Sequence, residues 1–435
     1  MTEGIDELLA RAGGILRQQT PSLAAGELTA YVERHYAARE RYLALLETSP
    51  PPLYVLETQT LRDRAGAFRA AFENVLPTTS FYYAVKSNNL PELSACLLEC
   101  GFGLDVSSGQ ELESALALGA HDIAFSGPGK TDAELALAVA HANRVTVLMD
   151  SFGELPRLAA LAAKAAAPVR AGVRLTPDTA GLWRKFGVPL AELRHFWEEA
   201  ERHAPHVQLK GIQFHVSWNL SPDAQIATVE RLGAEIARWP GPLRGRIEFL
   251  DIGGGFWPTQ GEWLRAEGTP EGQLRHLLDT GPAPPLAHYR LPAAGIGVFA
   301  DRLGRAIREH VFASGPCRIC FEPGRWICND AMHLLVSVVD RKGPDMAITD
   351  AGTNMIGWER FESDYAPVLN LTRPALQEVP CLILGSLCTP HDVWGGSYWG
   401  AGLQPGDVLL IPDQGAYTYS LRQQFIKPVP AVAVL

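Results

Sequence analysis

One lysine ends an otherwise apolar run, and this position gives its amine a chemical use. Lys86 closes the run Tyr83-Ala84-Val85-Lys86, which reads as a buried strand. Burial disfavours an ammonium group and lowers its pKa, which is what a lysine needs in order to bind an aldehyde covalently. A structural lysine paired with a carboxylate is the alternative. The sequence therefore marks Lys86 as a candidate carbonyl-binding amine.

Three consecutive glycines form a second candidate site. Gly253, Gly254 and Gly255 follow a short apolar run. Bare backbone lets N–H groups approach an anion closely, and barrel enzymes often hold phosphate after strands seven and eight. A tight structural turn is the alternative. A second glycine-rich stretch, at 127–131, resembles the end of a P-loop but lacks that motif's first glycine, so we reject it as a nucleotide site.

An acid and an arginine flank a forced turn in the segment Phe321-Glu322-Pro323-Gly324-Arg325. Glu322 is suited to hold a protonated ring nitrogen and Arg325 to hold a phosphate or carboxylate, unless the two simply pair with each other. Lys86 and His215 add an amine for an aldehyde and a ring for stacking. Together these groups point to a pyridine-aldehyde cofactor.

The segments that would position these residues alternate between β-branched or aromatic runs and longer amphipathic or alanine-rich stretches. This pattern predicts a parallel sheet in an α/β fold. An open doubly wound sheet is the alternative, but polar and glycine residues gather at the carboxyl ends of the runs, and only in a (β/α)8 TIM barrel do all those ends share one mouth. The eight expected strands are 80–86, 102–107, 123–127, 144–150, 169–175, 209–216, 246–252 and 318–322.

Three parts of the chain differ in pattern. Residues 1–50 read as a helical N-terminal extension, which is expected to pack on the barrel or on the second domain. Residues 51–326 are expected to form the barrel, starting after a run of prolines. Residues 327–435 show short strands with Gly, Pro and Asp turns, which predicts a β-sandwich or β-barrel-like C-terminal domain. Its expected strands are 333–340, 346–349, 377–384, 407–411 and 431–435.

Composition restricts the class of protein. Hydrophobic residues make up 47% of the 435 residues and charged residues 20%, which indicates a folded chain. The formal charge of -10 disfavours nucleic acid and anionic membranes as partners. No apolar run is long enough to span a bilayer, and the acidic start is unlike a signal peptide, so we expect a cytoplasmic protein. We expect reduced thiols and no metal, because the pair Cys317 and Cys320 reads as part of a strand.

From Leu53 to Phe425 the sequence resembles the fold-type III pyridoxal-phosphate decarboxylases, which include ornithine, arginine and diaminopimelate decarboxylases. The resemblance implies that Lys86 binds the aldehyde of pyridoxal 5′-phosphate, that His215 stacks on its ring and that Glu322 holds the pyridine nitrogen. A segment at 104–111 matches one that lies beside the cofactor in relatives. The other cofactor contacts implied are Asp105, Arg174, Ser217, Gly253, Gly254, Gly255, Gly324, Arg325 and Tyr417.

A cysteine motif extends the resemblance to the reaction. Cys388, four residues before Asp392, matches the cysteine that relatives contribute from a neighbouring subunit, and Phe425 matches an interface position. The resemblance thus implies a homodimer with shared active sites that releases carbon dioxide from the α-carboxylate of an amino acid. Cys388 is the expected proton donor to the resulting carbanion, with Lys86 re-forming its link to the cofactor. A buried free thiol is the alternative for Cys388.

Two departures from the family pattern concern the substrate. Thr389 follows Cys388 where relatives acting on diamines or diaminopimelate carry an acid, and a hydroxyl cannot make that charge-assisted bond. Trp218 follows Ser217 at the expected pocket rim. We therefore predict a modified or conjugated amino acid rather than free ornithine, lysine or diaminopimelate. The expected substrate contacts are Arg360, facing a distal carboxylate, with Thr389, Asp392, Trp183 and Phe425.

Two other functions use the same sequence features. Alanine racemases share this barrel plan, although they resemble the chain less around Cys388 and Glu322. A non-catalytic homologue acting as a binding regulator is the second alternative, and the joint retention of Lys86, Glu322 and Cys388 argues against it.

Overall fold

The computed structural model describes residues 4–176, 181–278, 286–357 and 364–435, which form two compact units. The barrel unit comprises Thr58–Thr259 and Ala294–Cys328. The β-rich unit comprises Met1–Glu57, Gln260–Ala293 and Asn329–Leu435. Each unit therefore contains segments that are far apart in the sequence.

Eight parallel strands close the barrel, which confirms the predicted fold. They pair in the order β5-β4-β3-β2-β12-β9-β8-β6, and pairing of β5 with β6 completes the ring. Each expected run overlaps one of these strands. Their bounds are β2 Thr79–Ala84, β3 Gly103–Val106, β4 Ile123–Phe125, β5 Val145–Met149, β6 Val169–Thr176, β8 Val207–Phe214, β9 Phe249–Asp251 and β12 Arg318–Phe321, with the short β7 Val188–Pro189 added beside β6.

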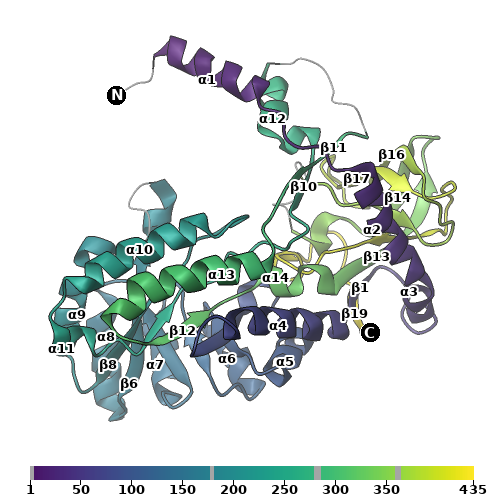
Figure 1. Ribbon diagram of the computed structural model, residues 1–435. Helices are drawn as coiled ribbons and strands as arrows, with labels where there is room; N and C mark the ends of the chain where they lie inside the picture. The colour runs from purple at the N-terminus through teal and green to yellow at the C-terminus, as the bar shows by residue number, and fades with distance from the viewer. Residues whose placement is uncertain (1–3, 177–180, 279–285, 358–363) are drawn as a thin grey trace. The chain divides into compact units, whose positions relative to one another are not determined.

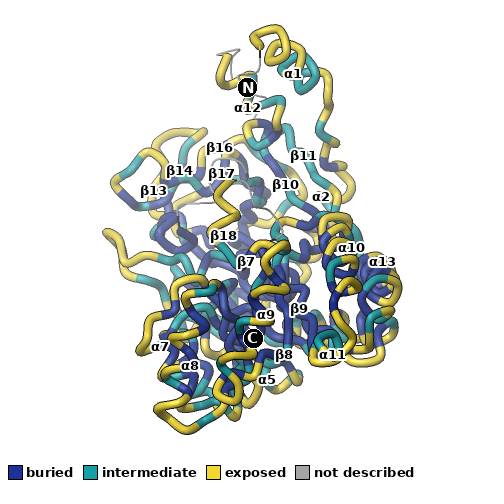
Figure 2. The backbone as a smooth tube through the Cα atoms, turned by 90° about the vertical axis from the view of Figure 1, so that its left-hand side faces the viewer, coloured by how far each residue is buried: buried dark blue, intermediate teal, exposed yellow. Residues whose placement is uncertain are grey.

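Helices follow the strands and cover the outside of the barrel. On this outer surface α13 lies between α10 and α4 and contacts both (Figure 1). Their inward faces are buried and their outward faces exposed (Figure 2). Side chains define some of the starts: Thr131 and Glu134 form a capping box, and Ser108 caps another helix. The helices are α4 Thr58–Glu73, α5 Pro91–Glu99, α6 Gly109–Ala117, α7 Asp132–Ala140, α8 Glu154–Ala165, α9 Leu193–Glu201, α10 Asp223–Ala237, α11 Gly241–Arg244, α13 Ile296–Ala306 and α14 Arg325–Cys328.

Aromatic side chains fill the barrel and its seam with α4. The ring of Phe249 lies where a Cβ on Gly211 would be, so glycine is required there for the ring to fit inside the barrel. On α4, Phe72 packs against Phe321 of β12 with ring centroids 4.1 Å apart. This packing fixes the end of β12, and the residues that follow it belong to the candidate site.

The β-rich unit contains a closed sheet built around the long strand β13. The order β14-β16-β17-β15-β18-β13-β1-β19, with an additional β13–β14 pairing, gives a closed barrel to which β1 and β19 are added. A β-barrel-like domain therefore fits better than a sandwich. The strands are β13 Met332–Arg341, β14 Met346–Thr349, β15 Leu369–Asn370, β16 Glu378–Leu384, β17 Val393–Trp399, β18 Val408–Ile411 and β19 Ala431–Val434.

Two boundaries differ from the sequence expectation. β1, Leu53–Leu56, was expected to start the (β/α)8 barrel, but it pairs with β13 and β19 of the β-rich unit. The segment 260–293 was also expected in the (β/α)8 barrel, and it instead supplies a hairpin and a helix to the β-rich unit. These are β10 Glu262–Arg265, β11 His288–Leu291 and α12 Pro270–Leu277. Both segments were assigned to the wrong unit because the residues that they contact are distant in the sequence.

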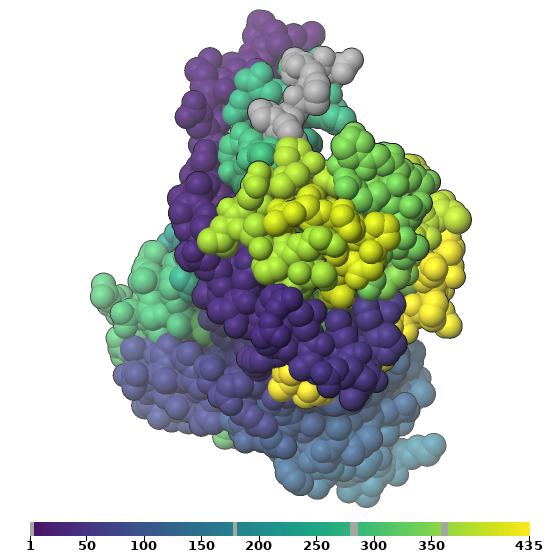
Figure 3. All heavy atoms as spheres, turned by 90° about the vertical axis from the view of Figure 1, so that its right-hand side faces the viewer, coloured from purple at the N-terminus to yellow at the C-terminus, as the bar shows by residue number. Residues whose placement is uncertain are grey.

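The N-terminal helices are α1 Ile5–Arg17, α2 Ala25–Ala37 and α3 Arg39–Leu45. Tyr31 and Val32 of α2 and Tyr42 of α3 join one buried cluster with Leu335 and Leu369 of the β-barrel. By contrast, α1 has no buried residue and lies beside α12 (Figure 3). Among the described helices, none has both the length and the apolarity needed to cross a bilayer.

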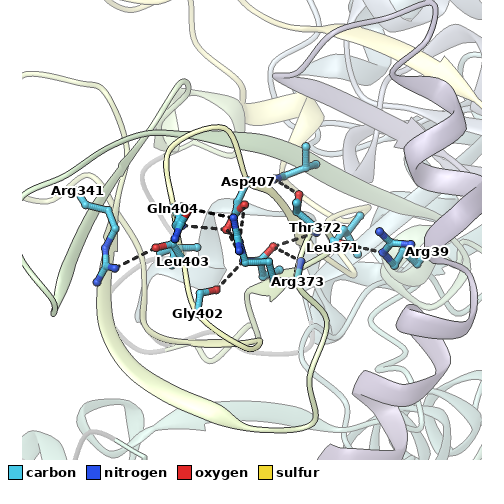
Figure 4. Close-up of polar contacts among 11 residues, drawn as sticks. Arg39, Arg341, Leu371, Thr372, Arg373, Gly402, Leu403, Gln404 and Asp407 are labelled. Atoms are coloured by element: carbon cyan, nitrogen blue, oxygen red, sulfur yellow. Dashed lines mark hydrogen bonds and ion pairs between the residues drawn. The ribbon is translucent and has the colours of Figure 1, made fainter.

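A buried carboxylate organises one end of the β-rich unit (Figure 4). Asp407 accepts hydrogen bonds from the Asn370 side-chain amide at 2.9 Å and the Gln404 backbone N–H at 2.9 Å. Arg373 Nε donates to both Asp407 oxygens at 3.2 Å. Several donors thus compensate the cost of burying this charge.

Candidate functional site

The carboxyl ends of the barrel strands bring together most of the residues expected to bind a cofactor. Lys86 lies in the 3-10 turn Val85–Ser87 directly after β2, and Asp105 lies on the neighbouring β3. Lys86 Nζ is 3.1 Å from Asp105 Oδ2, whose side chain is fully buried. Ser126, directly after β4, donates to the other oxygen of Asp105 at 2.7 Å. The amine is therefore held at the barrel mouth by an oriented carboxylate.

His215 directly follows β8, and both of its ring nitrogens are bonded. The Gly254 backbone N–H donates to Nδ1 at 3.1 Å, and Nε2 lies 3.0 Å from Ser217 Oγ. Because Nδ1 accepts, the neutral ring carries its proton on Nε2 and donates it to Ser217. Burial, assisted by the positive charges of Lys86 and Arg174, holds the pKa of His215 well below its usual range. The imidazole is thus neutral at physiological pH.

The triple-glycine turn is a backbone cradle between two strand ends. Gly253 and Gly255 have φ of +69° and +82°, a region that glycine alone enters without strain. A Cβ on Gly254 would collide with the carbonyl of Glu322, and one on Gly255 with the carbonyl of Val216. Asp251, at the end of β9, accepts the Gly253 N–H at 2.9 Å. The glycine identities are therefore required by close backbone approach.

Glu322 directly follows β12, is 2% exposed and faces several other charges. Burial raises its pKa well above the ordinary value, and the nearby Asp105 and Asp251 add to the shift while Lys86 opposes it. Burial likewise raises the pKa of Asp251 to about 7. Such a carboxyl group carries a proton that it could give to a ring nitrogen placed beside it, and the resulting carboxylate would pair with the protonated ring.

Gln213 is a site residue that the sequence analysis missed. Its Nε2 donates to both oxygens of Glu322 at 3.3 Å, and its Oε1 has no hydrogen-bond partner among the described residues. It lies on β8 two residues before His215, so both side chains point to the same side of the strand. A polar amide at this spacing from the histidine, inside an apolar strand, was the available signal.

The guanidinium groups of Arg174 and Arg325 each lie over an aromatic ring. Arg174, on β6, lies over the ring of Phe186 with 4.6 Å from Cζ to the centroid, and its Nε has no hydrogen-bond partner in the described part of the chain. Arg325 lies over the ring of Trp257 at 4.4 Å. A Cβ on Gly324 would collide with Ser87 Oγ, so this glycine allows the turn after β12 to approach the lysine turn.

The glycine-rich stretch resembling a P-loop is structural. Lys130 is buried, and its Nζ donates to the carbonyls of Gly127 and Leu148, each at 2.8 Å. It also pairs with Glu154 at 2.9 Å. The ammonium group is therefore engaged by groups of the protein itself.

The remaining predicted residues lie in the β-rich unit, apart from Trp183, which is 44% exposed in the barrel unit. Cys388 is exposed and Thr389 half-buried, whereas Tyr417 has a positive φ of 58° and Phe425 is 42% exposed. Cys388, Thr389, Tyr417 and Phe425 therefore belong to the β-rich unit, whereas Lys86 belongs to the barrel unit. Arg360 lies outside the described residues.

Asp392 was expected to contact substrate, and the structure gives it another set of partners. Its carboxylate is 2% exposed and accepts the backbone N–H of Thr353 and that of Leu387, each at 2.7 Å. Leu387 directly precedes Cys388. Asp392 therefore fixes the backbone that leads into the cysteine.

The residues at the barrel mouth fit pyridoxal phosphate. The partnerless, buried Arg174 Nε and Gln213 Oε1 indicate that a polar group is needed to complete the site. The amine of Lys86, the neutral ring of His215, the raised pKa of Glu322 and the glycine cradle match an aldehyde, an aromatic ring, a pyridine nitrogen and a phosphate. Fold and site together define a (β/α)8-barrel enzyme of the pyridoxal-phosphate type.

Comparison with known proteins narrows this class. Residues 60–278 match the family model described as pyridoxal-dependent decarboxylase, pyridoxal binding domain. The chain is 28% identical to a diaminopimelate decarboxylase of Methanothermobacter thermautotrophicus, covering 87% of this chain and 85% of that protein. It is 26% identical to the L-glutamyl-[BtrI acyl-carrier protein] decarboxylase of Niallia circulans, covering 87% and 86%. The chain belongs to the fold-type III pyridoxal-phosphate-dependent decarboxylases.

Solved structures agree on the fold. The diaminopimelate decarboxylase of M. jannaschii in complex with L-lysine superposes with a TM-score of 0.76 at 21% identity, covering 91% of this chain and 89% of that chain. The family model and the sequence relatives support the decarboxylase interpretation over racemisation and over a non-catalytic homologue.

Proposed function

We propose that this decarboxylase acts on an amino acid whose distal end is modified or conjugated, rather than on free ornithine, lysine or diaminopimelate. The observation that carries the proposal is Thr389, directly after Cys388, where an acid would be needed to bind a distal ammonium group. Conjugation removes the distal charge, so a hydroxyl is sufficient. The similarity to an enzyme that acts on glutamate linked to a carrier protein supports the same substrate class.

The chain's own residues account for the steps of the reaction. Lys86 would hold the aldehyde of pyridoxal phosphate, Glu322 its ring nitrogen and the glycine cradle its phosphate, while His215 would lie against the ring. When bound, the cofactor accepts the electrons left as carbon dioxide departs. Asp105 keeps the Lys86 amine oriented. Glu322 would give its proton to the ring nitrogen, and its carboxylate charge would then keep that nitrogen protonated. The neutral His215 adds no positive charge of its own.

Proton return to the α-carbon completes the reaction. We assign this step to the thiol of Cys388, contributed by the second subunit of a homodimer, and Phe425 to the same interface. The exposed position of Cys388 is compatible with such a role. A cytoplasmic location, and the absence of nucleic-acid and membrane partners, remain predictions from the sequence.

Release of carbon dioxide from a panel of substrates tests the proposal. The holoenzyme is incubated with free ornithine, lysine and diaminopimelate, and in parallel with the same amino acids and glutamate carried as amides or thioesters. We expect release only from conjugates, and none with Lys86→Ala. Turnover of a free amino acid at about ten per second, typical of enzymes, would contradict the proposed substrate class.

A further inference from the structure

A groove of about 670 Å³ opens in the barrel unit beside the cofactor site. Its inner end is formed by His215 and Ser217, the two residues joined by the hydrogen bond at the barrel mouth. From there it runs along one face of α10. It is lined by Trp183, His215, Val216, Ser217, Trp218, Ala224, Ala227, Thr228 and Arg231.

Two exposed indoles flank the groove. Trp218 is 63% exposed and Trp183 is 44% exposed, and large apolar side chains presented to water in this way are characteristic of binding surfaces. Trp218 is also held at a φ of +54°, which is strained for a residue with a Cβ. Asn219 maintains this turn, because its side chain donates to the Val216 carbonyl at 2.7 Å and its backbone N–H to the Gly255 carbonyl at 2.9 Å.

The floor of the groove is one face of α10. Ala224, Ala227, Thr228 and Arg231 follow the spacing of residues that share a helix face. The three small side chains leave room for a linear chain over a length of about 10 Å along the helix axis, at about 1.5 Å per residue.

A cation lies at the outer end of this face. Arg231 Nε donates to the Ala227 carbonyl at 3.3 Å, one turn earlier. Within the described residues its guanidinium forms no ion pair with a carboxylate, whereas Arg238, directly after the end of α10, pairs with Glu235 at 3.3 Å. The remaining N–H groups of Arg231 are suited to a phosphate oxygen.

We infer that this groove holds the arm of a carrier-protein-linked amino acid, with an uncharged linear chain between the two indoles and its phosphate on Arg231. This inference rests on the proposed function, since only a conjugated substrate has an arm to place. The amino acid itself would enter the site at the inner end, beside His215. The arm chemistry that fits is that of phosphopantetheine, which joins a thioester to a protein through amides and a phosphate.

Binding of the arm alone tests the inference without requiring catalysis. The holoenzyme is titrated by calorimetry with 4′-phosphopantetheine and with pantetheine, which lacks the phosphate. We expect Arg231→Gln to weaken phosphopantetheine binding at least about tenfold, as loss of a charge-assisted hydrogen bond predicts, and to leave pantetheine binding unchanged. Ala227→Leu, which fills the groove at an exposed position, should weaken both ligands. Arg238→Gln is the matched control and should change neither.

Equal phosphopantetheine binding by the wild type, Arg231→Gln and Ala227→Leu would overturn the inference, as would no binding at all. Coenzyme A carries the same arm extended by a nucleotide. Binding of coenzyme A more than about tenfold tighter than phosphopantetheine would favour a nucleotide-linked substrate and would also overturn it. The proposed function is tested separately by carbon dioxide release from glutamyl phosphopantetheine: failure there with intact Arg231-dependent binding contradicts the proposed function and not the groove.

Discussion

The Gly254 backbone N–H donates to Nδ1 of His215 at 3.1 Å, so the triple-glycine turn sets the tautomer of the ring next to it. The same turn is a candidate phosphate cradle, and its shape depends on the absence of a side chain. A single backbone segment therefore prepares two parts of the cofactor site.

Gly254→Ala is expected to weaken retention of pyridoxal phosphate by at least about tenfold, since overpacking of this kind costs about 1–3 kcal/mol. The added Cβ would collide with the Glu322 carbonyl and displace the N–H from His215. Absorbance of the bound cofactor after dialysis measures the effect. Gly241→Ala, where no atom lies within 4 Å of the added Cβ, is the control. Full retention of cofactor by Gly254→Ala would show that the cradle is not used.

Asp392→Asn is expected to lower kcat about ten- to a hundredfold while leaving cofactor absorbance unchanged. The amide can accept only one of the two backbone N–H bonds that Asp392 now accepts, so the segment leading to Cys388 loses its anchor. Leaving one of these buried groups unpaired costs about 1–3 kcal/mol of stability.

Steady-state rates, read together with thermal unfolding, separate the two effects of Asp392→Asn. Asp345→Asn, at an exposed position of the same unit, serves as the comparison. An unchanged kcat in a destabilised Asp392→Asn protein would limit the residue to a structural role.

Much of the barrel was predictable because each strand is a short buried run that ends at a polar or glycine residue. The pairing of Leu53–Leu56 was not, since four apolar residues form a strand equally well in either sheet and only contacts with β13 and β19 decide. β17 was missed because Gly395 and Gly396 interrupt its pattern. Lys86, His215 and Glu322 were found from their places at strand ends, whereas Gln213 and the groove along α10 depend on three-dimensional neighbours.

The buried Asp251 predicts a pH dependence of stability. Burial raises its pKa from 3.8 to about 7, so between these values the folded protein binds a proton that the unfolded chain has released. The free energy of unfolding should therefore fall as pH rises through this window and be unaffected by Asp251 below it. Asp251→Asn removes the titration, and its unfolding free energy should fall less steeply, by up to about 1 kcal/mol per pH unit.

Urea unfolding of the wild type and Asp251→Asn at pH 5, 6 and 7 measures these slopes. Asp122→Asn, at a carboxylate of the same barrel that accepts a hydrogen bond from Tyr82 at 3.0 Å, provides the control. Parallel slopes for the wild type and Asp251→Asn would mean that the residue stays charged in the folded protein.

An active site shared between two subunits, as proposed for Lys86 and Cys388, predicts complementation between two inactive variants. Lys86→Ala removes the cofactor lysine and Cys388→Ala the proposed proton donor, so each homodimer should be inactive. If the two residues come from different subunits, a mixed dimer has one site that lacks both groups and one that is intact. Random re-association makes half of the dimers mixed, so the mixture should recover about one quarter of the wild-type rate.

Carbon dioxide release before and after subunit exchange measures this recovery. A mixture that stays inactive while exchange is demonstrated would place Lys86 and Cys388 in the same subunit's site, because every site would then lack one of them.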